Sequence, residues 1–263
     1  MDLTIVISYY RAIQNLKIIL KALANQSFRN FEVIVSEDDY NVETIAFISE
    51  NSKQYPFSLK HIHQTEDIGF RKNMMLNKCL QFCQTEKIVF IDGDCIPHRF
   101  FTEAYCKHIQ SGYFYAGRSV MMDQKISDEI VKNQSLHKLN LFALLFTNSQ
   151  KVKDAIYSPY FPLTFKNKGL VGRNWGILRK HLLEINGFDE DYIEAGVGED
   201  VDIEWRLIAN GIKGKSIKNK AITFHIFHKQ WYSEEKVQYN FDLMYEKQRR
   251  NLVKCLNGIE KLI

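Results

Sequence analysis

The chain has 263 residues, of which 45% are hydrophobic and 25% are charged, and its formal net charge is +4. This length is near the upper size of a single domain, and the composition excludes a largely disordered chain. No run of lysine or arginine is interleaved with aromatic residues, and the net charge is small, so we expect no nucleic-acid partner.

The beginning of the chain and its cysteines bear on the cellular compartment. The start, MDLTIVIS, lacks the basic and long apolar regions of a signal peptide, and no stretch approaches the ~18 apolar residues of a membrane helix. The five cysteines include no C-x-x-C pair, which argues against a disulfide framework or a zinc knuckle. The sequence therefore predicts a cytoplasmic protein.

The first half of the chain alternates short apolar runs with stretches whose apolar residues recur at helical spacing. The runs predict strands at 3–8, 31–36, 59–64 and 87–92. The stretches predict helices near 16–23, 41–51, 75–83 and 99–110. This order is typical of an α/β fold with a mostly parallel sheet and helices on both faces. Ligands of such sheets bind beyond the carboxyl ends of the strands.

The alternation ends at about residue 118, and a helical, aromatic-rich region follows at 123–168. No repeat or linker separates the parts, so we expect one domain over residues 1–245. The remaining segment, 246–263, places Leu252, Leu256 and Ile259 on one helical face and basic residues on another. This pattern predicts a C-terminal amphipathic helix, which would pack on the body of the protein or contact anionic lipid.

Two acids follow the fourth predicted strand in the run VFIDGDCIP (89–97). Asp92 and Asp94 flank Gly93, and a glycine at this point lets a ligand approach the backbone closely. Carboxylate oxygens are the ligands that Mg²⁺ and Mn²⁺ prefer, and a substrate phosphate can complete their coordination. An ordinary Asp-Gly turn has the same sequence, so this motif alone leaves both interpretations open.

A second candidate site lies after the third strand, which ends at Gln64. The stretch GFRKN (69–73) places Arg71, Lys72 and Asn73 at the start of a helix. Backbone N–H groups and the helix dipole favour an anion there, whereas basic side chains oppose the dipole. A bound phosphate would explain the basic residues, and a solvated surface is the alternative.

Three further motifs lie in the second half of the chain. Glu199 and Asp200 follow a Gly-x-Gly loop and begin a helix, where they serve as helix caps or as catalytic acids. His225 and His228 follow a predicted strand, and one of them would complete a metal site with an acid of the DGD motif, a structural histidine being the alternative. Trp175, in a polar loop between two glycines, would stack on a sugar or lie buried.

These motifs together resemble the inverting family-2 glycosyltransferases of the GT-A fold. The later part resembles the C-terminal segment shared by β-1,4-galactosyltransferases and polypeptide N-acetylgalactosaminyltransferases. The ordered set spans residues 3–228 and comprises S-Y-Y-R at 8–11, S-E-D-D at 36–39, D-x-G-x-x-x-N at 67–73, F-I-D-G-D at 90–94, the glycine–aromatic loop at 172–176, N-G-F-D-E at 186–190, G-E-D-x-D at 198–202 and H-x-x-H at 225–228.

The resemblance implies a nucleotide-sugar site at the strand ends, in a nucleotide-binding half (1–117), and an acceptor-binding, catalytic half (118–245). The implied nucleotide-sugar residues are Ser8, Tyr10, Arg11, Asp38, Asp39, Gln64, Arg71, Asn73, Asp92, Gly93 and Trp175. Tyr10 stands where the family usually has Asn, and E-D-D-Y replaces the common D-D-G-S, so the uracil contacts of Asp38 and Asp39 are the least secure.

The resemblance also implies a metal site and a catalytic base. Mn²⁺ or Mg²⁺ would be bound by Asp94 and His225, and Asp92 would either be a further ligand or face the ribose or a metal-bound water. Asp200 would be the general base, and Glu199 would position the acceptor. Transfer of this kind needs a cation that stabilises the departing diphosphate and a base within ~3 Å of the acceptor hydroxyl.

The implied activity is transfer of a hexose or N-acetylhexosamine from a UDP-sugar to a glycan acceptor, with inversion to a β-linkage. UDP-Gal and UDP-GalNAc are favoured, and UDP-Glc and UDP-GlcNAc stay open. Bacterial surface-polysaccharide synthesis is the implied context, in which a lipid-linked acceptor would give membrane contact a purpose at the inner face of the cell membrane.

Three other functions compete with this interpretation. DGDCI partly matches the D-x-D-x-T/V of haloacid-dehalogenase phosphatases, but those enzymes carry it on an early strand. A nucleotidyltransferase would share the acids, but SYYRAIQ lacks the expected glycine-rich loop. A non-catalytic nucleotide-sugar-binding module would need neither the acid pair at 199–200 nor a complete metal site.

Overall fold

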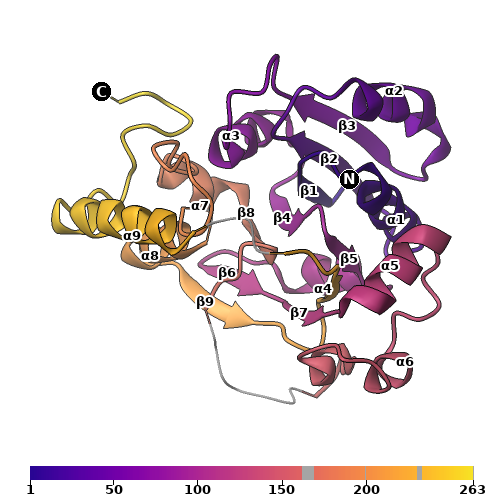
Figure 1. Cartoon of the computed structure of the whole chain (residues 1–263). Helices are drawn as coiled ribbons and strands as arrows, with labels where there is room; N and C mark the ends of the chain where they lie inside the picture. Colours follow the sequence, from indigo (N-terminus) through magenta and orange to yellow (C-terminus); the bar gives the residue numbers. More distant parts are fainter. Residues whose placement is uncertain (162–168, 199, 230–232, 263) are drawn as a thin grey trace.

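The computed structural model describes residues 1–161, 169–198, 200–229 and 233–262. Its central seven-stranded sheet consists, in spatial order, of β3 (Ser58–His63), β2 (Phe31–Glu37), β1 (Leu3–Tyr9), β4 (Lys87–Asp92), β8 (Asn174–Leu178), β6 (Tyr113–Ala116) and β9 (Lys213–Ser216) (Figure 1). Strands β1–β4 are parallel where they pair, whereas β8 runs antiparallel to both β4 and β6. The four predicted strands and the mostly parallel sheet are confirmed.

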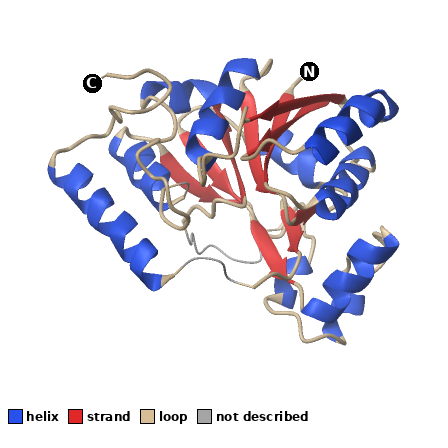
Figure 2. Ribbon diagram, turned by 45° about the horizontal axis from the view of Figure 1, so that its top comes forward, coloured by secondary structure: helices blue, strands red, loops and turns tan. Residues whose placement is uncertain are grey.

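Helices cover both faces of this sheet, as Figure 2 shows. The helices that follow the first four strands are α1 (Ile13–Ala24), α2 (Val42–Asn51), α3 (Lys72–Phe82) and α4 (Phe101–His108). Alternate strand residues feed two separate cores, because successive side chains of a strand point to opposite faces. Ile5 and Ile7 pack with α1, α2 and α4, whereas Val6 packs with α3 and with two helices of the second half, α7 (Arg179–Glu184) and α8 (Val201–Ala209).

A smaller, three-stranded sheet lies beside the carboxyl end of β4. It consists of β5 (Cys95–Pro97), β10 (Ile222–His225) and β7 (Arg118–Met121), with β10 in the centre. Strand β10 pairs antiparallel with β5 and parallel with β7. This sheet brings the HIFH motif beside the DGD motif, although more than 100 residues separate them in the chain.

The remaining elements are mostly short helices. They are η1 (Ser52–Gln54), α5 (Gln124–Asn133), α6 (Leu141–Leu145), η2 (Val152–Ala155) and α9 (Glu234–Arg249). The predicted helical region at 123–168 is thus confirmed in part, and its residues 162–168 lie outside the described residues. Within the described ranges, no helix combines the length and the apolar character needed to cross a membrane.

The prediction of a helix at 246–263 is wrong. Helix α9 ends at Arg249, and Asn251, which has a left-handed backbone (φ +52°), turns the chain out of the helix. The following residues pack back onto the body, where Asn186 Nδ2 donates to the carbonyl oxygens of Cys255 and Glu260, both at 2.8 Å. Lys247, one of the basic residues expected on the exposed face of that helix, is instead buried against Asp189. Tertiary hydrogen bonds here replace those that a helix would form.

Candidate active site

The polar ends of the parallel strands converge at one edge of the sheet. Ser8 lies between Ser36 and Asp92 in the register of the neighbouring strands. The Gly93 N–H donates to the Ser8 carbonyl at 2.6 Å. A Cβ atom on Gly93 would lie 2.9 Å from that same oxygen. The DGD turn therefore approaches β1 so closely that only glycine fits at its centre.

Asp38, just beyond β2, is held by two elements of the nucleotide-binding side. Its Oδ1 accepts from Gln64 Nε2 at 2.6 Å, and its Oδ2 accepts from the backbone N–H of Arg71 at 2.8 Å. Only 9% of its surface is exposed, and burial raises the pKa of Asp38 while these hydrogen bonds oppose the rise. The structure thus brings three predicted site residues, Asp38, Gln64 and Arg71, into one polar cluster.

Arg11 links the loop after β1 to two acids. Its Nε donates to Asp39 Oδ2 at 2.5 Å, and its Nη2 donates to Asp67 Oδ2 at 2.8 Å. The hydroxyl of Tyr10, a half-exposed residue, donates to the same Asp67 carboxylate at 3.2 Å. The hydrogen bond from Arg11 lowers the pKa of Asp39, which keeps that carboxylate ionised. Tyr10, Arg11 and Asp39 are therefore neighbours, as predicted.

The candidate metal centre lies where β5 and β10 meet. His225 pairs with Cys95 across the two strands, and the Ile226 N–H donates to the Asp94 carbonyl at 2.8 Å. One ligand atom each from Asp94, Cys95 and His225 lies within 4.8 Å of the others. His228 joins this group, because its Nε2 lies 3.1 Å from Asp94 Oδ2, compared with 3.4 Å for His225 Nε2. The structure thus brings Asp94 and His225 together.

The protonation of these groups suits a divalent cation. Burial lowers the pKa of His225, which favours the neutral imidazole that binds metals. Burial raises the pKa of Asp94, but the hydrogen bond from His228, whose own pKa this bond raises to about 9, and the positive charge of the histidines in their protonated form outweigh it, so that the pKa of Asp94 falls below the usual value. A carboxylate and a neutral imidazole fit Mn²⁺, while the Cys95 thiol, whose pKa burial raises strongly, is a poor ligand for it.

Asp92 points to a different partner. Its Oδ1 accepts from Lys72 Nζ at 2.8 Å, and it is not part of the Asp94–Cys95–His225 group. Lys72 therefore connects the start of α3 to the DGD turn, which explains a basic residue at that helix start. His228, which the sequence leaves open as the alternative ligand to His225, also contacts Asp94, whereas Cys95 is a neighbour of Asp94 for which no motif predicts a role at this centre.

Asp200, one of the two predicted catalytic acids, lies at the start of α8 (Val201–Ala209). Asp200 is the N-cap of this helix, and its Oδ1 accepts from the Val201 N–H at 2.7 Å. Glu199 lies outside the described residues. Gly198 packs against Tyr192, where a Cβ atom would lie 2.4 Å from the Tyr192 Cβ. The capping role is thus observed for Asp200, and the glycine loop before it packs closely on the body.

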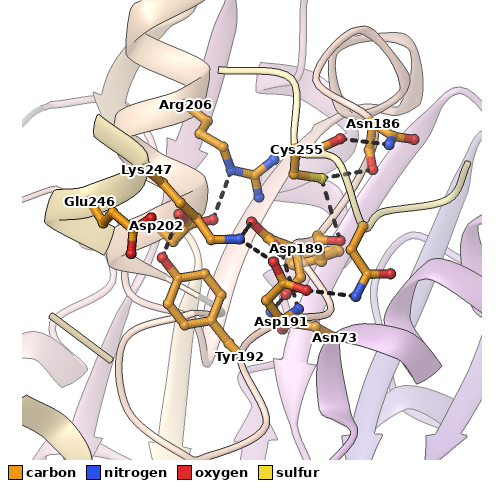
Figure 3. Close-up of polar contacts among 12 residues, drawn as sticks. Asn73, Asn186, Asp189, Asp191, Tyr192, Asp202, Arg206, Glu246, Lys247 and Cys255 are labelled. Atoms are coloured by element: carbon orange, nitrogen blue, oxygen red, sulfur yellow. Dashed lines mark hydrogen bonds and ion pairs between the residues drawn. The ribbon is translucent and has the colours of Figure 1, made fainter. Parts of the chain in front are cut away.

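A buried charge network, shown in Figure 3, includes Asp202 in the first turn of α8. Asp202 is fully buried and accepts from Tyr192 Oη at 2.9 Å, Trp205 Nε1 at 3.0 Å and Arg206 Nε at 2.7 Å. Arg206 in turn donates to the Ile185 and Gly187 carbonyls. Asp202, the last acid of the G-E-D-x-D motif, therefore has a structural role. Its i, i+4 spacing to Arg206 is the sequence signal for the ion pair between them.

Two other predicted site residues face the interior. Trp175 is 1% exposed and stacks on Phe90, with ring centroids 4.7 Å apart, so the prediction that it contacts the sugar is wrong. Strand β8 replaces the expected loop and turns this side chain into the core. Asn73 is also buried, and its Nδ2 donates to the Asp189 carbonyl at 2.7 Å. Its place beside N-G-F-D-E is structural.

Comparison with known proteins identifies the family. The model described as Glycosyl transferase family 2 matches residues 4–182. No curated protein sequence matches the chain. Among solved structures, the mannosyltransferase PcManGT from Pyrobaculum calidifontis, in complex with GDP-Man and Mn²⁺, has a TM-score of 0.64 at 14% identity, over 95% of this chain and 64% of that one.

Two other solved structures are similar over most of this chain. TarS from S. aureus has a TM-score of 0.62 at 15% identity, over 100% of this chain and 41% of its own. GalNAc-T7 with UDP, GalNAc and Mn²⁺ has a TM-score of 0.66 at 12% identity, over 94% of this chain and 48% of its own. The chain thus spans less than two thirds of each of these relatives. From the family match and the shared fold, this chain belongs to glycosyl transferase family 2 and has the GT-A fold.

Proposed function

We propose that the protein transfers a hexose or N-acetylhexosamine from a UDP-sugar to a glycan acceptor, with inversion at the anomeric carbon. The observation that carries the proposal is the pairing of Asp94 with His225 at the carboxyl edge of the sheet, next to the Asp38–Gln64–Arg71 cluster. GalNAc-T7 with UDP and TarS in complex with UDP-GlcNAc support a uridine donor, whereas PcManGT was solved with GDP-Man.

The strand-end residues would bind the nucleotide. Asp38 or Asp39 would accept a hydrogen bond from uracil, and Arg11 holds the Asp39 carboxylate in place. Lys72 beside Asp92 supplies positive charge at the edge where a diphosphate would lie. UDP-Gal and UDP-GalNAc stay the favoured donors, with UDP-Glc and UDP-GlcNAc as alternatives.

Asp94 and His225 would hold the cation, for which Mn²⁺ in two of the similar structures gives support. A bound cation would stabilise the negative charge that develops on the leaving diphosphate. Asp200 would accept the proton of the acceptor hydroxyl, whose oxygen bonds to the anomeric carbon as the bond to UDP breaks. One such displacement converts an α-linked donor to a β-glycoside.

The biological setting is part of the same proposal. The resemblance favours bacterial surface polysaccharide synthesis, and a lipid-linked acceptor would bring the enzyme to the inner face of the membrane. Such contact would require a surface other than 246–263, because the amphipathic helix expected there does not form.

The test is a panel of UDP-sugars with Mn²⁺ or Mg²⁺, scored for UDP release with and without EDTA. We expect release from at least one sugar, lost with EDTA and in Asp94→Ala. Asp200→Asn should lower kcat by roughly 10²-fold or more, because Asn caps a helix but cannot take a proton. Asp123→Asn, which changes the N-cap of α5, is the matched control and should keep full activity. Near-normal release by Asp200→Asn would remove the base assignment.

A further inference from the structure

A basic cavity lies beside the candidate metal centre, on the side of the second half of the chain. It has a volume of about 190 Å³ and is lined by Arg118, Ser119, Lys151, Asp154, Val171, Arg173 and Lys218. Four of these side chains are cationic and one is anionic. They come from four separate segments, namely β7, the η2 region, the residue before β8 and the turn after β9. Charge of one sign from four segments is costly to gather unless a ligand neutralises it.

Arg118 is the most deeply placed of these charges. It is 8% exposed, and its Nη1 and Nη2 donate to the carbonyls of Gly117 and Gly169 at 2.7 and 3.2 Å. Within the described part of the chain, no carboxylate forms an ion pair with it. Burial accordingly lowers the pKa of Arg118. Backbone carbonyls orient this guanidinium, and the charges of Asp154 and Glu204 act on it only from beyond ion-pair distance, so an anion in direct contact with it in the cavity would lower its energy.

Arg173 provides a second, independent observation. Its Nε is buried and has no hydrogen-bond partner among the described residues. Buried donors without partners are rare in native proteins, and each one calls for an explanation. In contrast, Lys218 already has an anionic partner, because its Nζ lies 2.8 Å from Asp154 Oδ1. The single acid of the cavity is therefore used, and Arg118 and Arg173 lie beside it without an ion-pair partner among the described residues.

The position of the cavity relates it to the acceptor and not to the nucleotide. Arg118 pairs with Ile222 on β10, three residues before His225, a separation of about 10 Å along the strand. The clusters that would bind the nucleotide lie instead on β1, β2 and α3, on the other side of the Asp94 turn. The charge of Arg173 also acts on His225 and Cys95, which places this arginine close to the metal centre.

We propose that this cavity binds a phosphate ester of the acceptor, so that the acceptor substrate is an anionic, phosphate-bearing glycan. The identification of the ligand as the acceptor rests on the proposed glycosyl transfer, whereas the phosphate-binding site itself does not depend on that function. Arg118 and Arg173 would donate to the phosphate oxygens, and Lys218 would add charge. Guanidinium groups suit this task because they present several donors in a fixed plane.

The probe is methyl phosphate, added to the full-length protein at constant ionic strength, with binding measured by ³¹P NMR and by the rise in Tm. We expect saturable binding that persists in the presence of UDP and Mn²⁺. Arg173→Gln and Lys218→Gln should each weaken it at least about tenfold. Lys153→Gln, an exposed change on η2 outside the cavity, is the matched control and should bind as the wild type does.

Each result supports or overturns the inference. Binding that UDP with Mn²⁺ abolishes would place the anion in the donor site, and binding that survives both glutamine variants would place it elsewhere; either result overturns the proposal, as does no binding at all. Circular dichroism of the variants separates lost binding from lost fold. Phosphate binding without UDP release from any sugar would leave this site intact and remove the proposed function, and the opposite pair of results would do the reverse.

Discussion

At the scale of single residues, Trp175 shows how this core is filled. Its indole stacks on Phe90 at 4.7 Å and meets the edge of Phe188 at 6.2 Å. All three rings are at most 2% exposed. They occupy the space between β4, β8 and the N-G-F-D-E turn, and so support the sheet edge that carries the DGD motif.

Trp175→Ala should therefore act on stability. We expect it to lower the free energy of unfolding by about 3–5 kcal/mol, the usual cost of removing a buried large aromatic side chain. Phe142→Ala, a truncation at a residue that is 76% exposed, should change it by less than about 0.5 kcal/mol. Urea unfolding followed by fluorescence or circular dichroism measures both. A stable Trp175→Ala protein with a raised KM for the UDP-sugar would restore the sugar-stacking role.

At the scale of elements, α9 holds the loop that leads to Asp200. Lys247 is 5% exposed, and its Nζ lies 2.5 Å from both Asp189 Oδ2 and Asp191 Oδ2. Figure 3 shows this ammonium group between the two carboxylates, with Tyr192 and Asp202 beside them. Lys247 and these two aspartates thus connect α9 to the turn that precedes the glycine loop.

Lys247→Met should cost about 3–5 kcal/mol, because it leaves the buried Asp189 carboxylate without its cation. Adding Asp189→Asn should restore part of this loss, since the variant then has no unpaired buried charge. Lys236→Met, a change in the same helix, removes an exposed ion pair with Glu194 and should lower the free energy of unfolding by under about 1 kcal/mol. Equal losses for the two lysines in chemical denaturation would contradict the structural role of Lys247.

Local periodicity predicts the helices and strands whose own residues show a regular apolar pattern. It fails for segments whose structure depends on contacts with residues distant in the chain. The runs at 3–8, 31–36 and 87–92 are continuously apolar because neighbouring strands and helices cover both faces, and this is visible in the sequence. Strand β8 is short and contains Asn174 and Gly176, and its pairing with β4 spans more than 80 residues of chain. The 246–263 segment has helical spacing, but Asn186 binds its backbone instead.

The same distinction applies to the predicted residues of the candidate site. Acids and histidines at strand ends were recognisable because strand order fixes which edge they reach, and Asp94 and His225 do meet there. Asn73 and Trp175 look like ligand contacts by motif, yet they are buried, because their environments are set by N-G-F-D-E and by β4. Arg118 belongs to no recognised motif and Arg173 lies in the glycine–aromatic loop, and only the folded chain shows that they share a cavity.

At the scale of the whole molecule, the metal centre joins two sheets that are far apart in sequence. Asp94 follows the central sheet, whereas His225 ends β10 of the smaller sheet, and the pairing of β10 with β5, the strand that directly follows Asp94, is the link that brings these two residues together. A cation bound by both residues would favour the state in which this link is intact. Ligand binding to the folded state alone raises stability in proportion to the logarithm of ligand concentration.

Mn²⁺ should therefore raise the Tm of the whole protein. At 100 times its Kd the expected gain is about 2.7 kcal/mol, which corresponds to roughly 5–10 °C for a chain of this size. His225→Ala and Asp94→Ala should each abolish most of this shift, and EDTA should reverse it in the wild type. His137→Ala, at an exposed histidine remote from β10, is the control and should keep the full shift. A shift of equal size in His225→Ala would show that the cation binds without His225, and would contradict the assignment of this histidine as a ligand.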